Sequence, residues 1–170
     1  ESLAAFLRQA YLVGLYHDAG KCMLLSYVGQ YSRSLLDEEF ACIKLHPRFG
    51  CSLLENLGMK DHALAAQYHH RAFDATGGYP AVLEDCPART RLLVDIVTVV
   101  DSLDAGTDNV GRSYAAAKTF DALIDELRAG RGTRYAPAVV NLLDDPAFYE
   151  DTRAFLEKSR RAAYLHAYCK

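Results

Sequence analysis

The sequence predicts an all-α bundle that forms a single domain. Apolar residues recur at helical spacing through most of the 170 residues, and glycine, proline and capping residues separate the periodic segments. No alternating strand pattern, internal repeat or low-complexity tract interrupts this organisation. Hydrophobic residues make up 51% of the chain and charged residues 24%, a balance that is typical of a globular domain with a buried core.

Eight segments carry the helical pattern. In chain order they are 1–16, 36–45, 49–57, 61–68, 89–105, 119–128, 137–143 and 146–168. In the first segment, the apolar residues that share one face are Leu3, Phe6, Leu7, Ala10, Tyr11 and Gly14. The last segment has a charged outer face, and it is expected to form a C-terminal helix within 146–170.

Local signals mark where several of these helices begin and end. Asp37 and Asp61 are expected to cap the second and the fourth helix. Pro47 suits the first turn of the third helix, because a proline there gives up no intrahelical hydrogen bond. Gly58 is placed to end that helix, and Thr119 is placed to cap the sixth.

Segment 89–105 is the most hydrophobic of the predicted helices. Its apolar residues lie nearly all round the helix, which is the pattern of a helix in the centre of a bundle. The conspicuous polar exception is Asp101. A buried carboxylate needs a strong partner, because removing it from water without one costs several kcal/mol.

Composition excludes several classes of function. The formal net charge is -3, so the chain has no general basic field for a nucleic acid polymer. No apolar run is long enough to span a membrane. The five cysteines form no C-x-x-C pair, so free thiols in a reducing cytoplasm are expected. The chain begins at Glu1 without a signal sequence, which we interpret as a domain of a larger sensor or regulator protein, without its N-terminal helix.

A set of His and Asp residues stands where the helical pattern expects apolar residues or helix ends. Its members are His17, Asp18, His46, His69, His70 and Asp101. Any one of them alone is an ordinary buried polar residue, but the recurrence of the same few residue types indicates a metal site. Nitrogen and oxygen donors without thiolates suit divalent iron, manganese, nickel or zinc. His62 and His166 lie on solvent faces and are assigned no function.

The adjacent pairs in this set favour two metal ions over one. His69 and His70 point about 100° apart on a helix, so they suit two neighbouring ions better than a single one. A carboxylate such as Asp18 can bridge such ions. Two metals about 3.5–4 Å apart clamp a phosphate group for in-line attack by a shared hydroxide. Lys21 is placed to neutralise a phosphate oxygen.

The order of these motifs is specific as a set. The motifs are His17-Asp18-x-Gly20-Lys21, His46-Pro47, His69-His70, Gly78-Tyr79-Pro80 and Asp101-x-x-Asp104-Ala105, with a weaker echo at Gly132-Thr133-Arg134-Tyr135-Ala136-Pro137. Up to about Asp144, the chain resembles the HD-GYP domains of the HD (His-Asp) metal-dependent phosphohydrolase superfamily. The resemblance implies an HD-type helical bundle, here of about seven to eight helices. It also implies two or three metal ions, often iron or manganese.

The resemblance further implies hydrolysis of cyclic di-GMP to pGpG or GMP, with a metal-bridging hydroxide as nucleophile. The implied ligands of one ion are His17, Asp18 and Asp101; those of the second are Asp18, His46, His69 and His70. Asp18 and Lys21 would act in catalysis, and Lys21, Tyr79 and Arg112 would contact the substrate. The Gly78-Tyr79-Pro80 loop would also bind partner signalling domains. A homodimer is left open.

The chain departs from the family pattern at several positions. No His precedes His17, although the family has one on an earlier helix. Arg71 replaces a Glu, Ala75 replaces a Gly, and Ala136 replaces an Asp. Two alternatives to an active phosphodiesterase therefore stay open. One is a catalytically impaired signalling domain that binds nucleotide or partner proteins; the other is an HD phosphohydrolase for another nucleotide phosphate ester.

Overall fold

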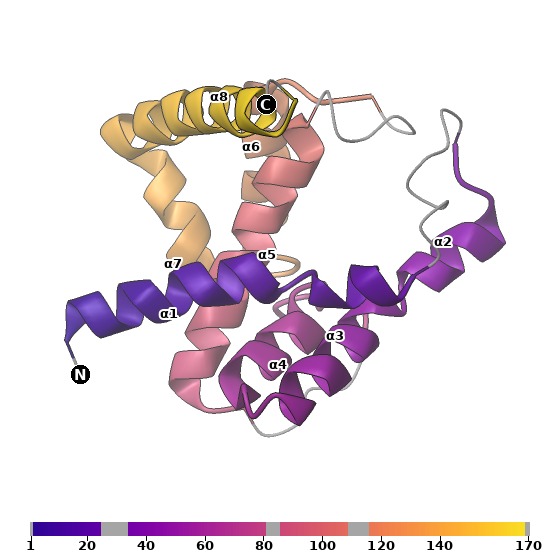
Figure 1. The fold of residues 1–170 in the computed structure, drawn as a ribbon. Helices are drawn as coiled ribbons and strands as arrows, with labels where there is room; N and C mark the ends of the chain where they lie inside the picture. Colours follow the sequence, from indigo (N-terminus) through magenta and orange to yellow (C-terminus); the bar gives the residue numbers. More distant parts are fainter. Residues whose placement is uncertain (1, 25–33, 81–85, 109–115, 169–170) are drawn as a thin grey trace.

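The computed structural model describes residues 2–24, 34–80, 86–108 and 116–168. These residues form α-helices, short 3-10 helices and connecting turns, with no strand among them (Figure 1). The α-helices are α1 Leu3–Tyr16, α2 Asp37–Ile43, α3 His46–Asn56, α4 Lys60–Tyr68, α5 Ala88–Thr107, α6 Phe120–Ala129, α7 Pro137–Val140 and α8 Pro146–Tyr168. The 3-10 helices are η1 Ala19–Met23 and η3 Asn141–Asp144. The predicted all-α fold of seven to eight helices is confirmed.

Helix α5 connects the two main parts of the hydrophobic core. Leu93, Val94 and Val97 pack in a cluster with buried residues of α1 and α4. Further along the same helix, Val99 and Leu103 pack with α6 and α7. The predicted central position of this helix is therefore confirmed. Within the described part of the chain, no helix is both long enough and apolar enough to cross a membrane.

The apolar face predicted for α1 is only partly correct. Phe6 and Ala10 pack with buried Val13 against α4 and α5, whereas Leu7 and Tyr11 are exposed. Leu3, at the beginning of the helix, is exposed as well. Apolar residues cover more of the surface of α1 than one contact face can bury. The residues that meet the core are Phe6, Ala10 and Val13, which follow one another at spacings of four and three residues.

Helix boundaries follow some of the sequence signals and not others. Asp37 does not cap α2; the N-cap is Leu36, whose backbone N–H donates to the Glu39 carboxylate at 2.8 Å. Helix α3 begins three residues earlier than predicted and carries Pro47 in its first turn. Gly58 has a φ of 75° directly after this helix, so its predicted role as a stop is confirmed.

The second half of the chain follows the predicted order of helices. The Thr119 hydroxyl accepts a hydrogen bond from the Ala122 backbone N–H at 3.2 Å, which confirms it as the cap of α6. The short helix predicted over 137–143 is divided into α7 and the 3-10 helix η3. Helix α8 begins at Pro146, as predicted.

Asp61 has a tertiary role that the sequence did not indicate. It lies inside α4, which begins at Lys60, so its predicted role as a cap is wrong. Its carboxylate instead accepts hydrogen bonds from Gln9 Nε2 and from Thr90 Oγ1, each at 2.8 Å. This one side chain thus joins α1, α4 and α5.

We expect Asp61→Ala to lower the free energy of unfolding by about 2–4 kcal/mol, because two hydrogen bonds to a charged group are lost. The Thr90 hydroxyl would also be left buried without its acceptor. Urea denaturation measures the change, with Asp125→Ala on the exposed surface of α6 as the matched control. An effect no larger than that of the control would contradict this role.

Candidate metal centre

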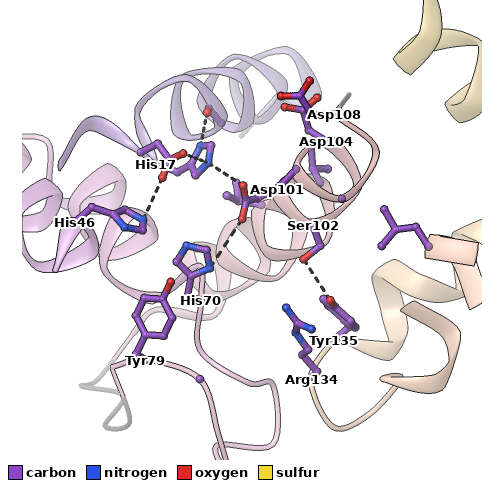
Figure 2. Close-up of a pocket in the computed structure, with 18 of the residues that line it drawn as sticks. His17, His46, His70, Tyr79, Asp101, Ser102, Asp104, Asp108, Arg134 and Tyr135 are labelled. Atoms are coloured by element: carbon purple, nitrogen blue, oxygen red, sulfur yellow. Dashed lines mark hydrogen bonds and ion pairs between the residues drawn. The ribbon is translucent and has the colours of Figure 1, made fainter. Parts of the chain in front are cut away.

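The predicted ligands of the metal centre lie together beside α5. They are His17 and Asp18 after the end of α1, His46 at the beginning of α3, His69 and His70 after α4, and Asp101 in α5. Figure 2 shows four of them, His17, His46, His70 and Asp101. Helix ends from three different helices therefore meet one carboxylate on the side of the central helix. This convergence is what a metal site requires of residues that are distant in sequence.

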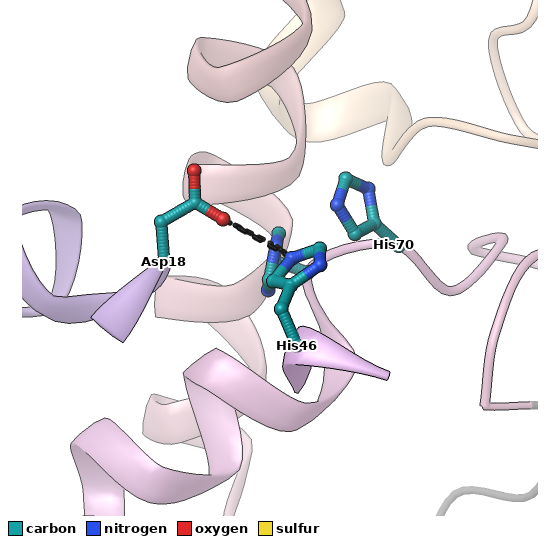
Figure 3. A group of neighbouring side chains, drawn as sticks. Asp18, His46 and His70 are labelled. Atoms are coloured by element: carbon teal, nitrogen blue, oxygen red, sulfur yellow. Dashed lines mark hydrogen bonds and ion pairs between the residues drawn. The ribbon is translucent and has the colours of Figure 1, made fainter. Parts of the chain in front are cut away.

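The first group of side chains surrounds His46. One ligand atom from each of Asp18, His46, His69 and His70 lies within 4.8 Å of the others. The Nε2 atoms of His46 and His69 are 3.2 Å apart. Asp18 Oδ1 lies 3.1 Å from His46 Nε2 (Figure 3). Both histidines are 1% exposed, so these donor atoms are directed at one another inside the protein.

The second group shares His69 with the first. His17, His69 and Asp101 also bring ligand atoms within 4.8 Å of one another. His17 Nε2 is 3.5 Å from Asp18 Oδ2 and 3.6 Å from Asp101 Oδ1. Asp18 therefore contacts histidines of both groups through its two oxygens, which is the position that a bridging carboxylate needs.

Backbone carbonyls orient three of the histidine rings in the same way. The Nδ1 atoms of His17, His46 and His69 lie 2.6, 2.7 and 2.8 Å from the carbonyl oxygens of Gly14, Ile43 and Ala66, respectively. A carbonyl can only accept, so each Nδ1 carries a proton, and in the neutral form of the ring Nε2 carries the lone pair. Such a second hydrogen bond sets the tautomer of a metal-binding histidine.

This arrangement fits a divalent cation. The Nε2 lone pairs of His46 and His69 face each other at 3.2 Å, which is repulsive unless a cation lies between them. His17 Nε2 is buried and has no hydrogen-bond partner among the described residues. Unpaired buried polar atoms are costly in a folded protein, and coordination of a metal ion would satisfy them.

The carboxylates of the site are ionised at neutral pH. Burial alone would raise the pKa of Asp18, but contacts with His46 and His69 and the positive charge of Lys21 hold it well below the usual range. Burial likewise raises the pKa of Asp101, and the contact with His17 together with neighbouring charges lowers it to about 2. The carboxylates of Asp18 and Asp101 therefore supply negative charge for a cation.

The histidines differ in their protonation. Burial lowers the pKa of His70 to about 3, and it also lowers the pKa of His69. These two rings are neutral at pH 7, which is the form that binds metals. Burial opposes protonation of His17 too, but the contact with Asp101 and the charge of Asp18 raise its pKa above the usual value.

A close backbone crossing holds the His-Asp motif against α3. A Cβ added at Gly20 in η1 would lie 1.9 Å from the His46 carbonyl oxygen and 2.4 Å from the Gly50 backbone nitrogen. Only glycine fits there without moving the backbone. This approach brings Asp18, two residues before Gly20, next to the His46 ring. The glycine of the motif is therefore required by packing between the two segments.

A cavity of about 1460 Å³ opens beside the cluster, and His17, His70 and Asp101 line it. Two of the predicted substrate contacts, Lys21 and Tyr79, line it as well. The Lys21 ammonium forms an ion pair with Asp18, and the Tyr79 ring lies 4.8 Å from the His70 ring. The third predicted contact, Arg112, lies outside the described residues.

Three departures from the family pattern are substitutions at residues that do not line the cavity. Arg71 is absent from the residues that line the cavity. Ala75 has a φ of 68°, a left-handed conformation that glycine adopts at lower cost. Ala136 is the N-cap of α7 and makes no side-chain capping bond there, so an Asp at this position would serve as a helix cap. The substitutions at Ala75 and Ala136 therefore bear on local backbone structure.

The lining includes residues to which the sequence analysis assigned no role. Ser102, Arg134 and Tyr135 all line the cavity, and the Tyr135 hydroxyl lies 3.3 Å from Ser102 Oγ (Figure 2). The available signal was the weak motif echo around Arg134. Local patterning could not place this turn beside α5, because the contact joins residues that are distant along the chain.

The chain is similar to curated phosphodiesterases. It is 36% identical over 132 residues to the cyclic di-GMP phosphodiesterase response regulator RpfG of Xanthomonas campestris, across 75% of the chain. It is 34% identical over 161 residues to a cyclic di-GMP phosphodiesterase of Vibrio cholerae, across 82% of the chain. The 3'3'-cGAMP-specific phosphodiesterase 2 of Vibrio cholerae is 30% identical over 132 residues, across 75% of the chain.

The matched region is a part of each relative. The chain spans 33%, 31% and 24% of the lengths of these three proteins, in the same order. No family model matches the chain. All three relatives are nevertheless named as phosphodiesterases of cyclic dinucleotides. The chain belongs to the HD-GYP domains of the HD metal-dependent phosphohydrolase superfamily.

Proposed function

We propose that the chain is a metal-dependent phosphodiesterase that hydrolyses cyclic di-GMP to pGpG or GMP. The observation that carries the proposal is the buried cluster in which two groups of His and Asp donors share His69. The two relatives whose names include cyclic di-GMP phosphodiesterase support the choice of substrate. A cavity of about 1460 Å³ beside the cluster offers space for a dinucleotide.

In this proposal two divalent ions bind at the cluster. His17 and Asp101 would hold one ion, Asp18 would bridge, and the remaining three histidines would hold the second ion. Nitrogen and oxygen donors suit iron or manganese, with nickel or zinc as further choices. When bound, the ions would supply Lewis-acid activation of the phosphate and of water.

The protein's own groups orient the donors and balance charge. Hydrogen bonds to backbone carbonyls keep the Nε2 atoms of His17, His46 and His69 directed inward. Preorganised donors need no rearrangement as charge develops at the reacting phosphate. Lys21 is half exposed beside Asp18, where its ammonium can turn toward a phosphate oxygen.

The direct test is hydrolysis by protein loaded with Mn²⁺ or Fe²⁺. Metal content is measured by mass spectrometry, and linear products are separated by chromatography after incubation with cyclic di-GMP. We expect pGpG or GMP to appear and chelation to stop the reaction. Fully metal-loaded protein that forms no product would overturn the proposal. Well-folded protein that takes up no metal would favour the alternative of a signalling domain without catalysis.

A second candidate is hydrolysis of a different cyclic dinucleotide. The relative named as a 3'3'-cGAMP-specific phosphodiesterase favours this possibility. The same reaction applied to cyclic di-GMP, 3'3'-cGAMP and cyclic di-AMP distinguishes the candidates. The substrate with the highest kcat/KM identifies the preferred bases.

We expect Lys21→Met to lower kcat/KM for phosphodiesters about ten- to hundredfold, because a charge-assisted contact to phosphate is lost. Metal content should stay at the wild-type value, since an ammonium is not a metal ligand. Lys158→Met, on the exposed surface of α8, is the matched control. Loss of metal together with activity would contradict a role for Lys21 in binding phosphate.

A further inference from the structure

The cavity has a second positive region besides the one at Lys21. Among the described residues that line it, the Lys and Arg side chains are Lys21, Lys118 and Arg134. Lys21 is paired with the cluster through Asp18. Lys118 and Arg134 instead approach the same carboxylate, Glu126 in α6. The lining thus carries cations in two separate places.

Two connections hold Arg134 at a short distance from the metal ligands. Its backbone carbonyl accepts a hydrogen bond from the Phe73 N–H at 3.1 Å, and Phe73 is three residues after His70. Three residues of extended chain span at most about 11 Å. The next residue, Tyr135, donates from its hydroxyl to Ser102 at 3.3 Å, and Ser102 adjoins Asp101. Arg134 is therefore anchored to two segments that carry proposed ligands.

The Arg134 side chain is available to an anion. Its guanidinium lies 3.5 Å from Glu126 Oε1, and the side chain is 60% exposed. It stands 5.0 Å from the centre of the Tyr135 ring, and Figure 2 shows it beside Tyr135 in the cavity. With two cations and one carboxylate, the group of Lys118, Glu126 and Arg134 has a net charge of one positive unit.

We propose that Arg134, with Lys118 beside it, binds the phosphate of a cyclic dinucleotide that is not being hydrolysed. This inference rests on the proposed function, in which the scissile phosphate lies at the metal cluster. A cyclic dinucleotide has two phosphates in one small ring, and each carries a negative charge. A cation in the cavity other than Lys21 would therefore be available to the second phosphate. A guanidinium can donate two parallel hydrogen bonds to its oxygens.

The test compares two substrates in one variant. We expect Arg134→Met to lower kcat/KM for cyclic di-GMP about ten- to hundredfold. The rate of hydrolysis of bis(p-nitrophenyl) phosphate should stay within about twofold of wild type, because this substrate has no second phosphate for Arg134 to bind. Arg134→Lys keeps the charge and should recover part of the loss. Arg131→Met, in the same turn but paired with Asp144 and outside the cavity lining, is the matched control.

The activities of Arg134→Met on the two substrates distinguish the possible outcomes. A loss confined to the dinucleotide, with wild-type metal content and thermal stability, supports the phosphate subsite. An equal loss on both substrates, or no loss on either, overturns it while the proposed function stands. Wild-type protein that cleaves bis(p-nitrophenyl) phosphate but no cyclic dinucleotide overturns the proposed function, and this inference with it.

Discussion

Asp18→Ala is expected to remove metal from both positions of the centre and to lower phosphodiesterase activity at least about a thousandfold. The reason is that Asp18 contacts histidines of both groups, with Oδ1 3.1 Å from His46 Nε2 and Oδ2 3.5 Å from His17 Nε2. Asp101 also lies 3.6 Å from His17 Nε2 and 3.9 Å from His70 Nδ1, but among the described carboxylates only Asp18 contacts His46 as well as His17. Metal content by mass spectrometry and hydrolysis of cyclic di-GMP are the two measurements.

The fold should persist in this variant. The surrounding imidazoles can remain buried in their neutral form, as the lowered pKa values of His69 and His70 already indicate. Circular dichroism checks that the helical content is unchanged. Asp151→Ala, on the exposed surface of α8, is the matched control and should retain metal and activity. Wild-type metal content in Asp18→Ala would rule out the bridging role.

Gly20→Ala should destabilise the protein by about 3 kcal/mol or more, because overpacking against fixed backbone atoms cannot be relieved by a rotamer change. The added Cβ would lie 1.9 Å from the His46 carbonyl oxygen and 2.4 Å from the Gly50 nitrogen. Relief requires η1 to move away from α3, which separates Asp18 from His46. We therefore expect metal content to fall together with stability, as measured by urea denaturation and mass spectrometry.

Gly14→Ala provides the control for the glycine substitution. It adds the same methyl group four residues before Asp18, and no atom lies within 4 Å of the new Cβ. Removing a glycine from a helix interior should raise the free energy of unfolding by about 0.5–1 kcal/mol. The two variants thus have opposite expected signs. A stability in Gly20→Ala equal to wild type would show that η1 and α3 can separate without cost.

The helical fold was predictable because its signals are local. Thr119 and Gly58 act as cap and stop as their chemistry indicates, and α8 begins at Pro146 as predicted. The failures are also informative. Asp61 is of a residue type that is favoured at helix N-caps, yet it lies within α4 and joins three helices. Its partners Gln9 and Thr90 come from distant segments, so no local rule identifies them.

The members of the cluster were predictable because each stands where the pattern requires an apolar residue or a helix end. Their assignment to individual ions stays a prediction. The hydrogen bonds from His17, His46 and His69 to backbone carbonyls, which set the tautomers of these rings, were not predictable, although each joins residues three apart. Sequence specifies which rings are present, but the rotamer that directs Nε2 inward depends on what packs around the ring.

The sequence alone therefore determined the all-α class, the order of the helices, the family, and the residue types of the candidate metal centre. These depend on periodicity, capping chemistry and motif order, which are properties of neighbouring residues. Only the tertiary structure decided that His46 and His69 meet at 3.2 Å, that Gly20 must have no side chain, and that Arg134 shares the cavity with the cluster. Those relations follow from how helices pack across large separations in sequence, where burial and backbone contact set the distances.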